Sequence, residues 1–372
     1  MKLRTKAAIC SALVITVAGS VAALTHATTL RASSTAANGQ LAWGGVTVAN
    51  PDGTARHVLG LPWPGGRPVW SPDGSRLLVT VSRPNTPDRP ATMNADGSGL
   101  TLLDAAPKNM YLECAAWSPD GTRLLCAGTE QDGAPLSVYS IRASDGGDVT
   151  RLTNGGVDYV ADYSPDGKRF VFVDQKGDIE DKESGAIFVE NTDGTGLHQI
   201  TAYGVPMAED FERVDWSPDG SEILFVTPHW SLDTVHPDGT GLKEIVHGQE
   251  GCPCPFDPTW SPDGTKIAYA YNPDSTFSDI YTANADGTHK INITKDSGGE
   301  NWPSWGTHPL AQKCTAAEKA KRAKAVADYK RQMAAARRAY FRTHQSAKAR
   351  AAYIKRQQAK LKDLERQAAA CA

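Results

Sequence analysis

The sequence predicts an all-β fold, a six-bladed β-propeller closed by N- and C-terminal strands, with a C-terminal α-helical hairpin. Three observations carry this prediction: a short motif recurs at the spacing of a propeller blade, an Asp-Gly motif lies inside each repeat, and the composition changes abruptly near residue 313. The 34 Gly and 23 Pro among 372 residues agree with a chain rich in turns.

The first motif is WSPDG or a close variant of it. Its aromatic residue lies 47, 46, 53, 44 and 45 positions from the next, and this period is typical of a blade of four strands. The motif is YSPDG at the third position and is reduced to SWG at the last. The six aromatic residues are Trp70, Trp117, Tyr163, Trp216, Trp260 and Trp305.

A second motif lies later in each complete repeat and contains Asp-Gly, as in NADGSG at Asn94 and NADGTH at Asn284. Apolar and polar residues alternate before it, as in DIYTANADG, and a short apolar run follows. Such a pattern around Asp-Gly indicates a hairpin, because glycine adopts the positive φ of a tight turn at little steric cost. We therefore expect SPDG to join strands one and two of each blade, and Asp-Gly to join strands three and four.

The two ends of the array are complementary fragments. Residues 40–59 contain the Asp52-Gly53 hairpin without a preceding WSPDG, and residues 299–306 supply a first strand with no second strand after it. One blade split between the chain ends accounts for both fragments. Closure of this kind protects strand edges that would otherwise be unpaired.

The repeat WSPDGTKIAYA...DIYTANADGTHKINIT, which begins at Trp260, resembles the WD40-like (PD40) repeat of the TolB β-propeller family. The resemblance covers about residues 40–308 and implies a six-bladed propeller that works as a binding platform in the cell envelope. The sequence departs from TolB itself in showing no N-terminal α/β domain and in carrying the helical tail.

The N-terminus has the features of an export signal. Lys2, Arg4 and Lys6 precede an apolar run over residues 7–24, and small residues over 22–27 suit a signal peptidase. We expect a signal peptide at 1–27, a linker at 28–39, the propeller at 40–312 and the helical hairpin at 313–372. The mature protein is then secreted, periplasmic or associated with the cell envelope. An uncleaved membrane anchor is the alternative interpretation.

Without Cys10, which lies in the signal, six cysteines remain in a chain that is expected to leave the reducing cytosol. Cys114 and Cys126 lie symmetrically about an SPDG turn, and a disulfide is expected if paired positions sum to 240, a register in which Trp117 faces Arg123. Cys252 and Cys254 flank one proline and form a small-ring disulfide or bind a metal. Cys314 and Cys371 meet if the tail folds into a hairpin.

The tail is basic and helix-forming. From Lys313 onward it holds 17 Lys+Arg against 4 Asp+Glu, with no Gly or Pro, whereas residues 1–312 hold 22 against 38. Apolar stripes run through Val326, Tyr329, Met333, Ala336 and Tyr340, and through Ile354, Leu361, Leu364, Ala368 and Cys371. We expect helices at about 316–342 and 346–370 in a hairpin. A single long helix or a disordered basic arm is the alternative.

Catalytic motifs are absent from the sequence. It contains no G-x-S-x-G nucleophile elbow, HExxH, P-loop or dinucleotide fingerprint. We therefore expect no catalytic residue, no cofactor and no metal site. The aspartates of the SPDG motifs are expected to stabilise turns rather than bind calcium: Asp73, Asp120, Asp166, Asp219 and Asp263.

One set of charged residues marks a candidate binding site. Each precedes the aromatic residue of a repeat by three to five positions, so the six are expected to cluster near one mouth of the central channel. They are Arg67, Glu113, Asp158, Glu212, Asp257 and Glu300. Five acids and one arginine form a ring that attracts a cation or a basic peptide. Solvated loop positions with no such function are the alternative.

These features together predict a non-catalytic propeller that binds a protein or peptide, with the basic tail contacting an anionic cell-wall polymer, membrane surface or partner. One alternative is a metal-dependent propeller enzyme of the lyase, lactonase or glycan-cleaving type, acting at the channel mouth, for which a tightly bound metal is the signature. The other is self-association through tail-to-body charge pairing, for which salt-sensitive oligomers are the signature. Nucleic acid is not the expected partner of an exported chain.

Overall fold

The computed structural model describes residues 38–84, 86–130, 135–154, 157–176, 184–206, 213–249, 253–274, 277–295 and 298–307, and part of the tail between 324 and 361. For residues 157–161 only the backbone is described. The predicted domain boundaries at 27 and 312, and the signal segment, lie outside these ranges.

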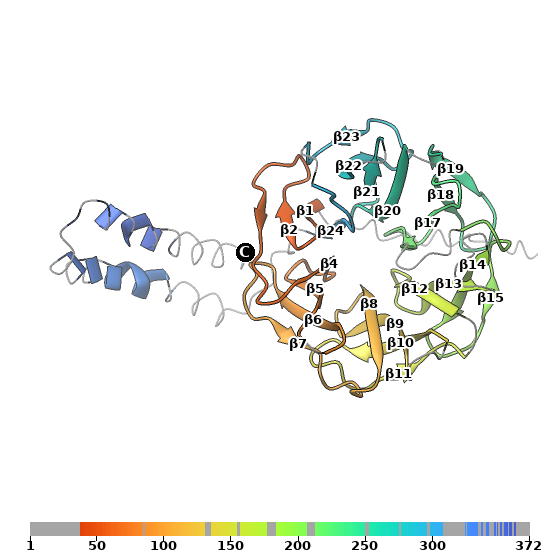
Figure 1. The fold of residues 1–372 in the computed structure, drawn as a ribbon, viewed down its shortest axis with the longest axis horizontal. Coiled ribbons are helices and arrows are strands. Elements are labelled where there is room, and N and C mark those ends of the chain that lie inside the picture. Colours follow the sequence, from red (N-terminus) through yellow and green to blue (C-terminus); the bar gives the residue numbers. More distant parts are fainter. Residues whose placement is uncertain are drawn as a thin grey trace, which may run out of the picture. The chain divides into compact units, whose positions relative to one another are not determined.

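Six antiparallel sheets of four strands surround a central axis, as Figure 1 shows. The first complete blade contains β4 (Gly65–Trp70), β5 (Arg76–Val81), β6 (Arg89–Asn94) and β7 (Thr101–Leu102). The second contains β8 (Tyr111–Trp117), β9 (Arg123–Thr129), β10 (Ser137–Arg142) and β11 (Thr150–Arg151). The third contains β12 (Val157–Tyr163), β13 (Arg169–Gln175), β14 (Gly185–Asn191) and β15 (His198–Gln199).

The fourth blade contains β16 (Asp215–Trp216), β17 (Ile223–Val226), β18 (Leu232–Val235) and β19 (Lys243–Val246). The fifth contains β20 (Cys254–Trp260), β21 (Lys266–Asn272), β22 (Asp279–Asn284) and β23 (Ile291–Asn292). The split blade contains β24 (Ser304–Thr307), β1 (Asn38–Trp43), β2 (Thr47–Ala49) and β3 (His57–Val58), in that order. The predicted six-bladed propeller is confirmed.

The two ends of the array close the ring. β24 pairs antiparallel with β1, with Trp305 opposite Leu41 and Ser304 opposite Ala42. The inner strands contact one another in sequence around the axis, from β4 through β8, β12, β16 and β20 to β24, which returns to β4. The predicted closure by a split blade is therefore present, and the inner strands line the centre of the ring.

The SPDG turns show why the motif recurs. Asp73 Oδ1 accepts hydrogen bonds from Ser71 Oγ (2.7 Å) and from the Ser75 N–H (3.0 Å), and Gly74 has a φ of +66°. The carboxylate thus satisfies local donors while glycine adopts a conformation that other residues rarely take. The same pair of bonds is made by Asp120, Asp166, Asp219 and Asp263.

The apolar core lies mainly between adjacent blades. One cluster joins Leu41 and Trp43 of the split blade to Ala268 and Ile280 of the fifth blade. Another joins Leu125 of the second blade to neighbours in the third, including Phe170 and Phe172. Each blade therefore buries its faces against the next, so the stability of one blade depends on the closed ring.

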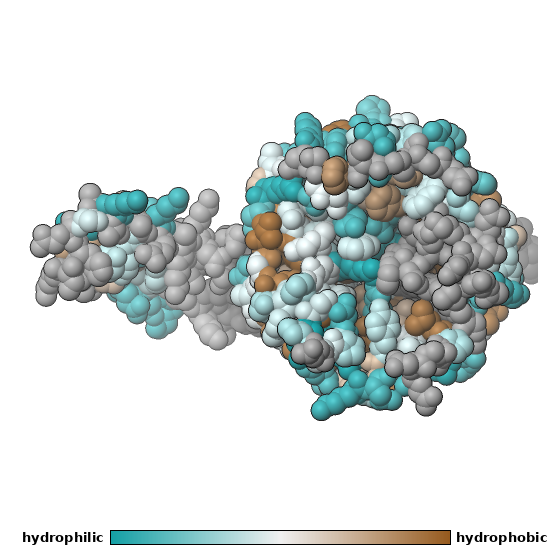
Figure 2. All heavy atoms as spheres, viewed as in Figure 1, coloured by the Kyte–Doolittle hydropathy of each residue, from teal (hydrophilic) through white to brown (hydrophobic). Residues whose placement is uncertain are grey.

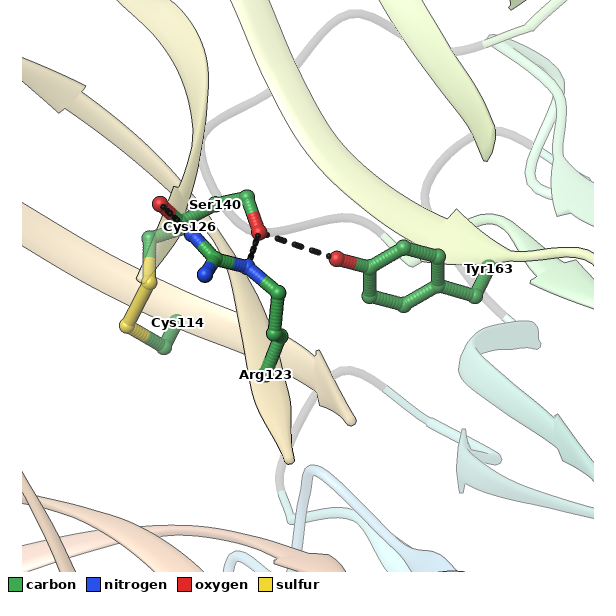
Figure 3. Close-up of a disulfide and its surroundings, with 5 residues drawn as sticks. All are labelled: Cys114, Arg123, Cys126, Ser140 and Tyr163. Atoms are coloured by element: carbon green, nitrogen blue, oxygen red, sulfur yellow. Dashed lines mark hydrogen bonds between the residues drawn. A yellow bond between two sulfur atoms is a disulfide. The ribbon is translucent and has the colours of Figure 1, made fainter. Parts of the chain in front are cut away.

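A disulfide joins β8 to β9 through Cys114 and Cys126, which are directly opposite in the strand pairing (Figure 3). The predicted register fails beyond this point, because Trp117 pairs with Leu124 and not with Arg123. A bulge between Cys114 and Ala116 adds one residue to β8, which shifts the pairing by one position. Symmetry about a turn cannot reveal such a bulge.

The other cysteines are described in part. Cys254 is disulfide-bonded. Cys252, Cys314 and Cys371 lie outside the described residues, so the two remaining expected pairs stay predictions.

Most described residues of the tail are helical, including residues 326–333, and Figure 1 draws these helical parts in blue. The rings of Tyr340 and Tyr353 stack with centroids 4.0 Å apart. Arg337 Nε donates a 2.7 Å hydrogen bond to Gln357 Oε1. These contacts join positions 13 and 20 residues apart, which requires the chain to turn back on itself. The tail therefore forms the predicted helical hairpin.

Candidate functional site

Bulges in the inner strands set the direction of the residues at one end of the channel. The pairing of β4 shifts between Gly66 and Val69, and Arg67 in this bulge has a φ of 53°. β20 has the corresponding shift after Phe256, where Asp257 has a φ of 50°. Positive φ is uncommon for residues other than glycine, and bulges redirect side chains near functional sites.

A cavity of 470 Å³ lies where several inner strands begin, at the end of the channel opposite the SPDG turns. Part of its wall is backbone, contributed by Gly44, Gly45, Gly65, Gly66, Gly298 and Gly299. The polar and aromatic side chains that line it include Arg67, Asp88, Tyr111, Glu113, Glu300 and Trp302. They come from the split blade and the first two complete blades. We call this space the mouth cavity.

Backbone hydrogen bonds hold the wall of the mouth cavity together, both within the split blade and between it and the first complete blade. The Gly44 N–H donates to the Asn301 carbonyl (2.8 Å), and the Arg67 N–H donates to the Gly44 carbonyl (3.2 Å). A Cβ atom on Gly66 would lie 2.7 Å from the Gly44 oxygen. Glycine is therefore required at position 66 by the close approach of two backbones.

Two carboxylates of the mouth cavity carry arginine partners. Arg67 forms an ion pair with Glu113 and places its guanidinium 4.4 Å from the centroid of the Trp302 ring. Arg56 donates a 2.5 Å hydrogen bond to Glu300. The cavity therefore presents paired charges beside an aromatic ring. A charged ligand could bind there by replacing one member of an existing ion pair.

Asp257 is buried beside the mouth cavity. Its Oδ2 accepts a 3.0 Å hydrogen bond from the Trp302 main-chain N–H, and the residue is 5% exposed. Burial raises the pKa of Asp257 to about 6, although Arg213 and Arg67 act in the opposite direction. The carboxyl thus links the fifth blade to the split blade rather than facing solvent.

The six predicted ring residues are placed as follows. Arg67, Glu113 and Glu300 line the mouth cavity together, and Asp257 lies buried beside it. Asp158 is in β12, where its backbone is opposite Asp174, and its side chain is not described. Glu212 lies outside the described residues. The grouping of all six as one ring stays a prediction.

A second group of charges at the other end of the channel was not predicted. Asp162, Arg213 and Asp215 line a 260 Å³ cavity among the SPDG tryptophans. The sequence signal was available, because Asp162 and Asp215 directly precede the motif aromatics Tyr163 and Trp216. The first two complete repeats have the apolar residues Val69 and Ala116 at this position.

These carboxylates connect neighbouring blades. Asp162 Oδ2 accepts a 2.8 Å hydrogen bond from the Trp216 N–H of the next blade. Asp215 Oδ2 accepts a 2.6 Å bond from the Trp260 N–H of the blade after that. Ser304 Oγ of the split blade likewise accepts a 3.1 Å hydrogen bond from the Trp70 N–H of the first complete blade, where the ring closes. We call these contacts the inter-blade clasps.

Burial is the main cause that raises the pKa of both clasp carboxyls. The pKa of Asp162 is well above its usual value, and the neighbouring Asp215 charge adds to the effect. The pKa of Asp215 is also raised, while the Arg213 charge favours its ionised form. One arginine therefore partly compensates carboxyls that would otherwise repel each other.

Two further properties bear on function. Among the residues that the structure describes, no group of three or more His, Cys, Asp or Glu side chains is arranged to hold a metal ion. In the same part of the chain, no helix has the length and apolar character of a membrane span. In Figure 2, hydrophilic residues gather around the axis on the face in view, and hydrophobic patches are scattered toward the rim.

Known proteins share this fold. Residues 46–230 match the family model of the TolB β-propeller domain, PD40. The crystal structure of TolB from Acinetobacter baumannii superposes with a TM-score of 0.58 at 19% identity, covering 72% of this chain and 66% of that chain. A putative TolB from Agrobacterium tumefaciens gives 0.53 at 18% identity, covering 68% and 87%.

A curated relative is dipeptidyl-peptidase 5 of Porphyromonas gingivalis, 28% identical over 247 residues. The match covers 60% of this chain and 33% of the peptidase, so the chain spans about a third of that protein's length. The repeat motif, the PD40 match over residues 46–230 and the six closed blades agree with one another, and they fit the TolB-like β-propeller family.

Proposed function

We propose that this protein is a non-catalytic propeller that binds a protein or peptide partner at the mouth cavity. The observation that supports this most is the convergence of Arg67, Tyr111 and Trp302 in a concave space built by three blades. Arginine, tyrosine and tryptophan are the residue types that carry most of the binding energy in protein interfaces.

The backbone of the mouth cavity adds to this proposal. Its glycines have no Cβ atoms, so an extended peptide can approach the wall closely and bond to main-chain groups. Glu113 offers a further contact, because an incoming cation can replace Arg67 as its partner. A peptide with a basic side chain or a free N-terminus has both kinds of group.

A crosslinking pull-down from the envelope fraction of the producing cell tests the proposal. The wild type is compared with a mouth variant carrying Arg67→Gln and Glu113→Gln, and with Asp104→Asn as the control. Asp104 pairs with Arg83 and does not line the mouth cavity. We expect the wild type and the control to retain the same partner and the mouth variant to lose it. Equal retention by all three contradicts the proposal.

We further propose that the basic tail contacts an anionic surface. Support comes from its 17 Lys+Arg against 4 Asp+Glu and from the exposure of Lys324 and Arg331 in the described helix. Sedimentation with vesicles containing anionic lipids, and with isolated cell wall, compares the full chain with one lacking residues 313–372. Loss of salt-sensitive binding on deletion is expected, and unchanged binding removes this role from the tail.

Export is part of the same proposal. The charged start and the apolar run over residues 7–24 support a cleaved signal. Mass spectrometry of the protein recovered from the envelope and the medium is expected to find a new N-terminus near residue 27. An intact Met1 in that material contradicts cleavage.

A peptidase-related activity is the second candidate, on the single observation of the match to dipeptidyl-peptidase 5. The sequence has no G-x-S-x-G motif, which that class of hydrolase uses to present its serine nucleophile. Incubation with a panel of chromogenic dipeptide substrates separates the two candidates. Release of the chromophore above a heat-denatured control favours the enzyme, and no release favours the binding propeller.

A further inference from the structure

A cavity between the second and third complete blades belongs to neither end of the channel described above. It has a volume of 510 Å³, within the range of small-molecule sites. Six of its lining residues carry a hydroxyl group: Ser118, Thr122, Ser140, Thr150, Tyr163 and Thr192. We call it the inter-blade cavity.

The inter-blade cavity coincides with a departure from the repeat. Tyr163 occupies the position at which four other SPDG motifs have tryptophan, and its ring is smaller. At the preceding junction Arg76 lies 5.5 Å from the centroid of the Trp117 ring. At the following junction Arg169 lies 5.0 Å from that of Trp216. In both cases a cation–π contact joins an arginine of one blade to the motif tryptophan of the next.

Arg123 is the equivalent arginine at this junction, and like Arg76, which bonds to Thr92, it bonds to a hydroxyl of the third strand. Its Nε donates a 2.6 Å hydrogen bond to Ser140 Oγ, and its Nη1 donates a 2.6 Å bond to Asp148 Oδ2. The Tyr163 hydroxyl lies 3.1 Å from the same Ser140 Oγ, as Figure 3 shows. The difference at this junction is therefore the smaller ring of Tyr163, which lines the inter-blade cavity.

Two carboxylates in the wall have acceptor capacity left. The turn occupies Oδ1 of Asp120 and Oδ1 of Asp166, and among the described residues no donor reaches Oδ2 of either. Hydrogen bonds from Ser118 and Ser164 are the leading causes that lower the pKa of these two carboxyls, so both are ionised at neutral pH. Each Oδ2 can therefore accept a strong, charge-assisted hydrogen bond from a ligand.

We propose that the inter-blade cavity binds a neutral or amino-bearing saccharide. Vicinal sugar hydroxyls donate to Asp120 and Asp166 and exchange hydrogen bonds with the hydroxyl-bearing residues of the wall. The apolar face of a sugar ring packs on Tyr163 and Leu152, which also line the cavity. Anionic ligands are disfavoured, because Asp148 compensates Arg123 while Asp120 and Asp166 keep their charges.

Saturation-transfer NMR on the full-length protein tests this proposal, with glucose, galactose, glucosamine, N-acetylglucosamine and trehalose as probes. Tyr163→Trp restores the ring found in the other repeats and fills the space. Asp166→Asn keeps the turn acceptor and removes the charge on Oδ2. Asp263→Asn makes the same change in an SPDG turn of the fifth blade, outside the cavity, and is the matched control.

We expect at least one probe to bind the wild type and the Asp263→Asn control with equal affinity. Binding is expected to be lost in Tyr163→Trp and to weaken roughly tenfold in Asp166→Asn, since a hydrogen bond to a charged group is removed. Failure of all five probes, or unchanged binding in Asp166→Asn, overturns the proposal. If Tyr163→Trp does not fold, Asp166→Asn decides alone. The result is independent of partner binding at the mouth cavity.

Discussion

The main-chain N–H of Trp302 and the carboxylate of Asp257 are joined by a 3.0 Å hydrogen bond between the split blade and the fifth blade. Trp302 stands just before β24, the strand that closes the ring, and Asp257 stands in the bulge of β20. Three similar bonds use Asp162, Asp215 and Ser304 in the inter-blade clasps. Near the centre of the ring, side-chain oxygen atoms of one blade thus accept hydrogen bonds from main-chain N–H groups of the next blade.

The titration of Asp257 gives the first prediction. Its pKa rises from 3.8 to about 6 on folding, so the stability that its protonation contributes is full below pH 3.8 and is lost as the pH rises through about 6. Asp257→Asn keeps an acceptor for Trp302 and does not titrate. Relative to wild type, the variant should gain about 3 kcal/mol of unfolding free energy between about pH 4 and 7.

Urea unfolding at several pH values measures this difference. Asp286→Asn is the control, because a hydrogen bond from Thr288 lowers the pKa of Asp286 and gives the opposite sign. This control should lose stability relative to wild type as the pH rises. A pH-independent difference between Asp257→Asn and wild type shows that Asp257 is not protonated on folding.

Arg213 is expected to contribute most to the free energy of unfolding when the clasp carboxyls are charged. Arg213→Met removes the cation that favours the ionised forms of Asp162 and Asp215. We expect a loss of roughly 2 kcal/mol at neutral pH, below the cost of breaking a buried pair because these groups also face the channel. The loss should be smaller at pH 4.5 than at neutral pH, because a lower pH favours the protonated carboxyls, which need no compensating cation. Thermal melts at both pH values measure it, and an equal loss at both contradicts this account.

The Cys114–Cys126 disulfide should stabilise the second blade. It closes a loop with a sequence separation of 12, for which chain entropy gives about 3 kcal/mol. The double variant Cys114→Ala and Cys126→Ala should therefore unfold at lower denaturant concentration. Mass spectrometry after alkylation shows whether the bond is present in the wild type. Equal stability of the oxidised wild type and the double variant contradicts the prediction.

A substitution at Gly306 tests how tightly the split blade packs against the first complete blade, where the ring closes. A Cβ atom at this position would lie 2.7 Å from Cδ2 and Cγ of Trp70, so Gly306→Ala forces the indole to move. We expect a loss of about 1–3 kcal/mol, typical of overpacking. Gly60→Ala is the matched control, since a Cβ there meets nothing within 4 Å, and its stability should be unchanged or slightly higher. Differential scanning calorimetry compares the two variants.

Much of the fold was predictable because the information is local and repeated. An SPDG turn needs only adjacent residues, since Asp73 caps its own turn and Gly74 supplies the positive φ. The spacing of the motif fixes the number of blades, and the fragments at the two ends fix how the ring closes. The apolar stripes of the tail likewise predicted the helices that meet at Tyr340 and Tyr353.

The sequence by itself determined the six-bladed ring, its turns and the candidate charges, whereas the tertiary structure decided which of those charges meet. The bulge after Cys114 changed the strand pairing from the predicted register. The bulge in β20 contains Asp257, whose carboxylate accepts the hydrogen bond from the Trp302 N–H. The clasps and the Arg67–Glu113 pair join residues of different blades, and the Arg56–Glu300 pair joins the two ends of the array within the split blade. Such contacts depend on strand twist, bulges and the packing of neighbouring blades, and these are long-range properties that no short motif encodes.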